Sequence, residues 1–187
     1  NIAYNQLDQR NIIKKNLITL IFTLGAVVLG LISLLFIIFF PILIEKVGLP
    51  KQIEDILAWS RWVVLGIILI LSLSVVYIIA PNRSNPKFAW VSPGAVLGTI
   101  FWLAGSLLFS WYVKNFGSYD DLYGSFAAVI ILMLWLFLTA FIVLMGAEIN
   151  SEIEHQTMYD TTVGEQKPMG ERGAYHADHH AKKSEED

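Results

Sequence analysis

Glu148 is the residue of this sequence that most clearly raises a chemical question. It directly follows residues 126–147, a run without any charged side chain, and Asn150 comes two positions later. Ionisable groups inside a membrane are costly and often mark ion or proton paths, whereas a carboxylate at a span end can simply meet water. Glu148 is therefore either a helix exit at the membrane surface or part of a site that includes a cation, with Arg83 and Lys87 nearest in topology.

A local partner for Glu148 is favoured by the helix dipole. An acid near the C-terminal end of a helix opposes that dipole by about 0.3–1 kcal/mol. We predict that Glu148 leaves the membrane beside the connection at residues 81–93 and pairs there with Arg83. Such a pair could lock two helices together or open as a gate.

The histidines and the remaining acids offer little chemistry. The sequence HADHH near the C-terminal end resembles part of a nuclease metal motif, but it follows no predicted strand and has no second group of ligands. We therefore predict no metal site and no cofactor. The chain has no cysteine and no P-loop, G-x-S-x-G or H-E-x-x-H motif, so we predict no catalytic residue. Asp120 and Asp121 are interpreted as a solvated turn.

Hydropathy predicts an all-α integral membrane protein. The 187 residues are 55% hydrophobic and only 16% charged, with a mean hydropathy of +0.56, whereas a soluble domain carries about a quarter charged residues. The charge deficit is concentrated in four runs long enough to cross a hydrocarbon core of roughly 30 Å. The predicted spans are about 17–40, 62–80, 93–113 and 126–147. Pro41 and Pro81 are expected to end the first two spans, and Ser92 is expected to cap the third.

The flanking charges predict the orientation. Lysine and arginine favour the cytoplasmic side, and they are densest before the first span and in the short, acid-free connection 81–93. We therefore predict that residues 1–16 form a cytoplasmic segment, that residues 17–150 form the four-helix transmembrane region, and that both termini of this chain are cytoplasmic. Residues 151–187 are polar and contain several glycines, so we expect a disordered cytoplasmic tail.

Small residues predict where helices pack closely. Gly94, Gly98 and Gly105 form one face of the third span, and Gly146 lies at the end of the fourth. Such faces let helix backbones approach each other in lipid, either in ordinary packing or in a homo-oligomer.

Three stretches together resemble a known family. They are NIAYNQLDQRNIIKKN before the first span, PNRSNPKFAWVSPGAVLGTIFW between the second and third, and YGSFAAVIILMLWLFLTAFIVLMGAEINSEIE at the fourth. Over roughly residues 1–154 the chain resembles the YihY/BrkB family of bacterial inner-membrane proteins. The most specific parts are the P-x-R…PGA connection and YGS…GAE-x-N.

The resemblance implies about six transmembrane helices in the complete protein, with both ends cytoplasmic and this chain forming the C-terminal part. It also implies a set of recurrent residues. These are Tyr4, Arg10, Pro81, Arg83, Trp90, Pro93, Gly94, Tyr123, Gly124, Gly146, Glu148 and Asn150. From them we take Glu148, Asn150, Arg83 and Arg10 as the candidate polar cluster. Phe126-Ala127 departs from the Leu-Gly that is more usual after YGS.

Members of this family carry labels as ribonucleases, serum-resistance factors and transporters. The predicted spans contain no Asp, Glu, Lys, Arg or His, which favours movement of a large amphiphile over movement of an ion. We therefore expect a transporter or exporter of a lipid or other envelope amphiphile in the bacterial inner membrane. The alternative is a non-transporting scaffold that binds an envelope partner, and a tRNA-processing ribonuclease is the least favoured reading. The expected partners are membrane lipids and a second copy of the chain, without nucleic acid.

Overall fold

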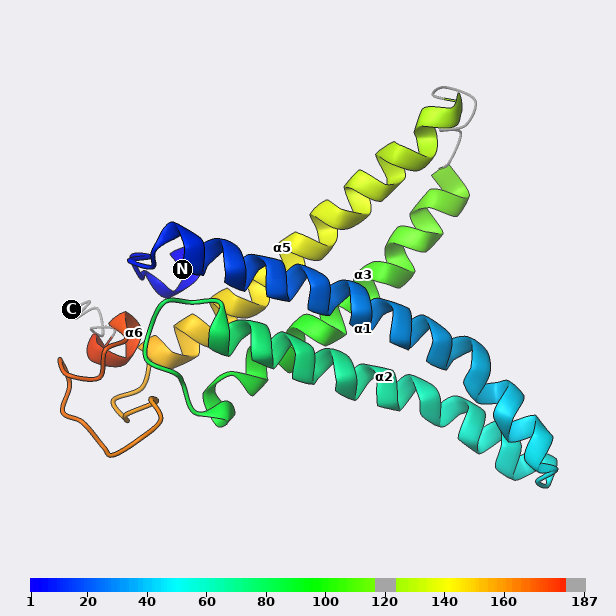
Figure 1. Ribbon diagram of the computed structural model, residues 1–187, viewed down its shortest axis with the longest axis horizontal. Helices are drawn as coiled ribbons and strands as arrows, with labels where there is room; N and C mark the ends of the chain where they lie inside the picture. Colours follow the sequence, from blue (N-terminus) through cyan, green and yellow to red (C-terminus); the bar gives the residue numbers. More distant parts are fainter. Residues whose placement is uncertain (117–123, 181–187) are drawn as a thin grey trace, which may run out of the picture. The chain divides into compact units, whose positions relative to one another are not determined.

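The computed structural model describes residues 1–116 and 124–180, and within them it is helical apart from loops and one isolated bridge. Four long helices dominate the chain: α1 (Ile12–Val47), α2 (Lys51–Ile79), α3 (Ser92–Phe116) and α5 (Ala127–His155). Each is long and apolar enough to cross a membrane. The prediction of an all-α membrane protein with four transmembrane helices is therefore confirmed (Figure 1). The predicted acid pair Asp120–Asp121 lies outside the described residues.

Pro41 does not end the first helix, contrary to the prediction from sequence. It lies inside α1, which continues to Val47 and ends at Gly48 in a left-handed conformation with a φ of 68°. A proline removes one backbone hydrogen bond, but neighbouring groups in a membrane helix can tolerate that loss. Glycine adopts a positive φ without steric cost, so α1 ends at Gly48.

The chain divides into two compact units. One unit is Gln9–Ser72 and contains α1 and most of α2, which are joined by a short turn at Gly48–Pro50. Most of the large apolar side chains of α1 are exposed in this unit, as expected of a surface that meets lipid or further helices.

The other unit comprises Asn1–Asp8 and Leu73–Asp187. Its centre is the antiparallel pair α3 and α5, which lie side by side (Figure 1). Four short helices of the described residues belong to it: η1 (Ile2–Tyr4), η2 (Phe88–Trp90), η3 (Gly124–Phe126), which precedes α5, and α6 (Tyr175–Asp178).

Helices α3 and α5 touch along their length through small and aromatic residues. The indole of Trp102 donates to the hydroxyl of Thr139 at 3.3 Å, and the rings of Trp102 and Trp135 lie 5.6 Å apart. A methyl group added to Gly105 would lie 3.1 Å from Cδ1 of Ile142. A larger residue at Gly105 would therefore require the side chain of Ile142 to shift.

The tail that follows α5, residues 156–180, has a defined structure, unlike the disordered tail that the sequence predicts. The guanidinium of Arg172 donates to the carbonyl oxygens of Met158, Tyr159 and Ala177 at 3.0, 3.2 and 2.7 Å. The carboxylate of Asp178 accepts from three backbone N–H groups at 2.8–3.0 Å. The polar composition therefore supplies internal hydrogen bonds in place of a hydrophobic core.

The glycines of the tail are turn residues. Gly164, Gly170 and Gly173 have φ values of 120°, 100° and 73°, which other residues adopt only with strain. Backbone pairing then fixes the tail against the connection between α2 and α3. Three backbone N–H groups donate to backbone carbonyl oxygens across this contact. They are Lys87 to Thr161 at 2.8 Å, Val163 to Asn85 at 2.9 Å and Ser84 to Gly173 at 3.0 Å.

Candidate functional site

The last turns of α5 carry a buried polar face. Gly146, Asn150 and Glu154 are spaced four residues apart, so they lie along one side of the helix, and Ser151 lies beside them. Asn150, Ser151 and Glu154 are at most 1% exposed. Each must therefore find a polar partner in the protein, because an unpaired buried polar group is costly.

Glu154 is the acid of this face. It forms an ion pair with Arg83, and the two side chains are 1% and 2% exposed. The hydroxyl of Thr161, from the tail, donates to the other carboxylate oxygen. The Arg83 guanidinium also lies over the ring of Tyr4, 4.3 Å from its centroid. Three distant parts of the sequence therefore meet at Glu154.

We call this group the polar cluster and define it as Tyr4, Arg83, Asn150, Ser151, Glu154 and Thr161. Burial raises the pKa of Tyr4 to about 12, although the nearby Arg83 acts in the opposite direction. The phenol of Tyr4 is therefore neutral at physiological pH, and the charges that meet in the cluster are those of Arg83 and Glu154. The hydroxyl of Ser151 donates to the carbonyl oxygen of Ala3, which ties the N-terminal segment to α5.

The predicted pairing of Glu148 with Arg83 is wrong, because Arg83 pairs with Glu154. Glu148 is exposed. It is two residues from both Gly146 and Asn150, which turns it by about 200° onto the opposite side of the helix. Glu148 and Asn150 therefore face different surroundings although they are close in sequence.

Asn150 caps another helix. Its Oδ1 accepts from the backbone N–H of Gly94 at 2.7 Å, in the first turn of α3. The first N–H groups of a helix have no partner within it, so this bond satisfies one of them. Ser92, which the sequence predicts as the cap, instead donates its hydroxyl to the carbonyl oxygen of Ala89. The cap of α3 therefore comes from α5.

The predicted packing glycines lie where α3 meets its neighbours. A methyl group on Gly94 would overlap the carbonyl oxygen of Gly146. One on Gly146 would overlap the hydroxyl of Tyr77 and lie 2.8 Å from the carbonyl oxygen of Gly94. The Tyr77 hydroxyl donates to the carbonyl oxygen of Val143 at 2.9 Å, and a methyl group on Gly98 would lie 3.3 Å from it. The end of α2 is thereby held to α5.

Arg10 belongs to the unit Gln9–Ser72, whereas the polar cluster belongs entirely to the other unit. The structure therefore brings together Arg83 and Asn150 from the predicted cluster, turns Glu148 away, and adds Glu154, Ser151 and Thr161. The spacing of four between Asn150 and Glu154 is the signal in the sequence that could have identified Glu154. Thr161 carries no such signal, because the tail shows no helical period.

Two of the histidines, His155 and His176, lie close together at the end of α5. The rings of His155 and His176 lie 4.6 Å apart, edge to face. Burial lowers the pKa of His176, and the neighbouring His155 lowers it further, whereas Glu154 and Glu152 act in the opposite direction. Across residues 1–116 and 124–180, no three His, Cys, Asp or Glu side chains are grouped as metal ligands would be.

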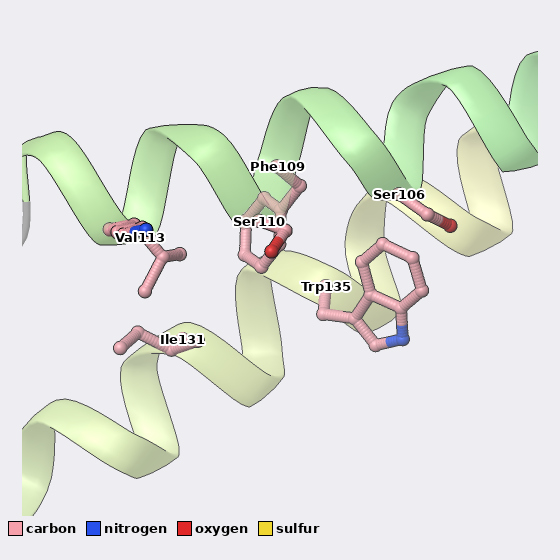
Figure 2. A pocket seen from close by; sticks show the side chains of 7 residues that line it. Ser106, Phe109, Ser110, Val113, Ile131 and Trp135 are labelled. Atoms are coloured by element: carbon pink, nitrogen blue, oxygen red, sulfur yellow. The ribbon is translucent and has the colours of Figure 1, made fainter.

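A second feature lies further along the pair α3 and α5. An open groove of about 500 Å³ runs between them. Figure 2 shows its lining, which combines aromatic and aliphatic side chains with two hydroxyls. The lining residues are Ser106, Phe109, Ser110, Val113, Lys114, Ile131 and Trp135. The groove is therefore mostly apolar, with polar groups on α3 and a cation near the C-terminal end of that helix.

Comparison with known proteins agrees with this architecture. Residues 1–170 match the family model described as virulence factor BrkB. The chain is 34% identical over 155 residues to the ribonuclease-like protein YfkH of Bacillus subtilis, which covers 81% of this chain and 56% of that protein. It is 27% identical over 144 residues to a UPF0761 membrane protein of Haemophilus influenzae, which covers 72% of this chain and 48% of that protein.

A UPF0761 membrane protein of Pseudoalteromonas atlantica is 40% identical over 81 residues, covering 43% of this chain and 26% of that protein. No solved structure matches the chain. The chain spans about half the length of the curated relatives that it matches over most of its own residues. The family model nevertheless covers all four long helices and the polar cluster, and the chain belongs to the BrkB family of membrane proteins.

Proposed function

We propose that this chain is part of a transporter or exporter of a lipid or other envelope amphiphile in the bacterial inner membrane, with both termini cytoplasmic and no catalytic chemistry of its own. The groove between α3 and α5 carries the proposal. It offers apolar side chains and hydroxyls in one continuous surface, which is the combination that an amphiphile presents.

The charge distribution supports an amphiphile over an ion. The predicted spans contain no Asp, Glu, Lys, Arg or His, so their interior offers no charged relay. The ring of Trp135 lies 5.5 Å from that of Phe109, and together they form an apolar wall suited to a hydrocarbon chain. Lys114, near the end of the groove, could attract a negatively charged headgroup.

The polar cluster at the other end of α5 would hold the bundle closed on the cytoplasmic side. Its ion pair joins α5 to the connection between α2 and α3, and Tyr4 and Thr161 cover it. Movement of the helices during transport would then require these contacts to shift. The cluster is thus proposed as a gate or lock.

The proposal is tested with the complete protein in liposomes. The crossing of fluorescent lipids of several headgroup classes is compared with crossing in empty vesicles. We expect protein-dependent crossing that is lost in Ser110→Phe, which fills the groove. Leu108→Phe, on the same helix but 67% exposed and outside the lining, serves as the matched control and should keep it. A folded protein that moves no lipid class would refute transport and favour the scaffold.

A further inference from the structure

The tail buries several polar side chains while it exposes several large apolar ones. Asp160, Thr161, Thr162, Arg172 and His176 are at most 8% exposed. By contrast, the large apolar side chains of the same segment point outward. Met158, Tyr159, Val163 and Met169 are 68%, 76%, 66% and 45% exposed. A segment surrounded by water normally shows the opposite pattern, because burial of apolar surface drives folding in water.

Four of these buried polar side chains, those of Asp160, Thr161, Thr162 and Arg172, are hydrogen-bonded within the protein, whereas Nδ1 of His176 has no hydrogen-bond partner. Asp160 accepts from the backbone N–H and the hydroxyl of Thr162 at 2.9 and 2.7 Å, and from the N–H of Lys167 at 2.9 Å. These hydrogen bonds hold the pKa of Asp160 at about 2, although burial acts in the opposite direction. The fold of the tail therefore does not depend on the outward apolar side chains, which remain available for an external contact.

The outward side chains lie directly beside the ends of membrane helices. Met158 and Tyr159 follow within four residues of His155, the last residue of α5. Val163 is paired with Asn85, and Thr162 forms a bridge with Pro86, in the connection between α2 and α3. Phe88, in the same connection, is 52% exposed. Amphipathic and aromatic side chains at this level normally contact the headgroup region of the bilayer.

We propose that Met158, Tyr159 and Val163, together with Phe88, form a membrane-contacting face that inserts into the headgroup region of the adjacent leaflet. The occupant of this face is the lipid surface, because Met158 and Tyr159 closely follow α5 and Phe88 closely precedes α3, two helices long and apolar enough to cross a membrane. Exposed acids of the tail, Glu165 and Glu171, would be repelled by anionic lipids. The contact is therefore apolar rather than electrostatic. It does not depend on whether the protein transports a lipid.

Site-directed spin labelling tests the face directly. The 187 residues contain no cysteine, so a single introduced cysteine gives one label site in this part of the protein. Tyr159→Cys and Val163→Cys are compared with Glu165→Cys in the complete protein, in lipid nanodiscs, with any cysteine elsewhere replaced. Because these three positions are exposed, labelling them should leave the tail folded, and unchanged thermal unfolding verifies this.

The readout is the collision of the label with oxygen, which concentrates in lipid, and with a water-soluble nickel chelate. We expect the ratio of oxygen to nickel collisions to be several-fold higher at positions 159 and 163 than at position 165. Equal ratios at all three positions would overturn the proposal, since the tail would then lie in water. Exclusion of both reagents at positions 159 and 163 would also overturn it, because protein would then cover the face.

Discussion

Replacing Glu154 by glutamine should strongly destabilise the protein, because the amide keeps the shape of the side chain but removes its charge. The guanidinium of Arg83 would then remain 2% exposed beside a neutral group. Removing one member of a buried ion pair costs about 3–5 kcal/mol, mostly because the other charge stays buried and uncompensated. For chains of roughly 150–250 residues this corresponds to a fall in Tm on the order of 6–20 °C, and the fall becomes smaller as the length of the protein increases.

The matched control is Glu148→Gln, six residues earlier on the same helix. Glu148 is exposed, so we expect its replacement to change the free energy of unfolding by less than about 0.5 kcal/mol. A second control replaces both partners, Arg83→Met with Glu154→Leu. Exchange of a buried pair for apolar residues is often neutral or stabilising. The double variant should therefore recover most of the loss seen in Glu154→Gln.

The assay is thermal unfolding of the complete protein in nanodiscs, followed by tryptophan fluorescence, with the Tm of each variant compared at equal protein and lipid concentrations. The reasoning is refuted if Glu154→Gln unfolds at the wild-type temperature while Glu148→Gln does not. That outcome would mean that Glu148 is the acid on which the stability of the bundle depends.

Three further outcomes follow from the same contacts. Gly146→Ala should lower the free energy of unfolding by about 1–3 kcal/mol, because its methyl group would meet the backbone of Gly94. The control Gly66→Ala should not destabilise the protein, because no atom lies within 4 Å of the added methyl group. Unfolding in SDS measures both variants. Asn150→Ala should lower the free energy of unfolding by about 1–3 kcal/mol, because it leaves the backbone N–H of Gly94 unpaired. Hydrogen exchange at the Gly94 amide should then be faster, and an unchanged exchange rate would contradict the capping role of Asn150. Because burial keeps the pKa of His176 below the ordinary value, the folded chain takes up this proton at lower pH than the unfolded chain. The stability that neutral His176 contributes is therefore complete above about pH 6.5 and is lost as the pH falls through the lowered pKa. Amide protection of α6 should accordingly decrease when the pH is lowered from about 8 to about 5. His176→Gln should abolish that pH dependence.

The position of the membrane helices could be predicted from sequence because the hydropathy of a segment is the sum over its own residues. A run such as residues 17–40 has no charge anywhere along it, so no tertiary contact is needed to assign it to the bilayer. Gly94 and Gly146 could also be identified from sequence as helix-packing residues, because close approach of two helix backbones in lipid requires small residues. That these two glycines meet each other depends on the register between α3 and α5, which the sequence does not state.

The contacts of the site were decided by the tertiary structure. Glu148 and Glu154 are the same residue type at the end of the same helix, and a sequence pattern that marks only the membrane boundary favours Glu148. Which of them is buried depends on how α5 is rotated against α3, and the contact of Gly146 with Gly94 fixes that rotation. Glu154 then faces Arg83, while Glu148 is turned outward.

The tail shows the same division between sequence and structure. Its polar composition correctly excludes a hydrophobic core, but composition alone cannot distinguish a disordered segment from one folded by internal hydrogen bonds. Arg172 and Asp178 reach their backbone partners in the folded structure, in which glycines with positive φ turn the chain. Hydropathy, a property of each residue, therefore determined that this chain lies in the membrane. The pairing of charges, caps and hydrogen bonds is a property of positions brought together by folding, and only the tertiary structure decided it.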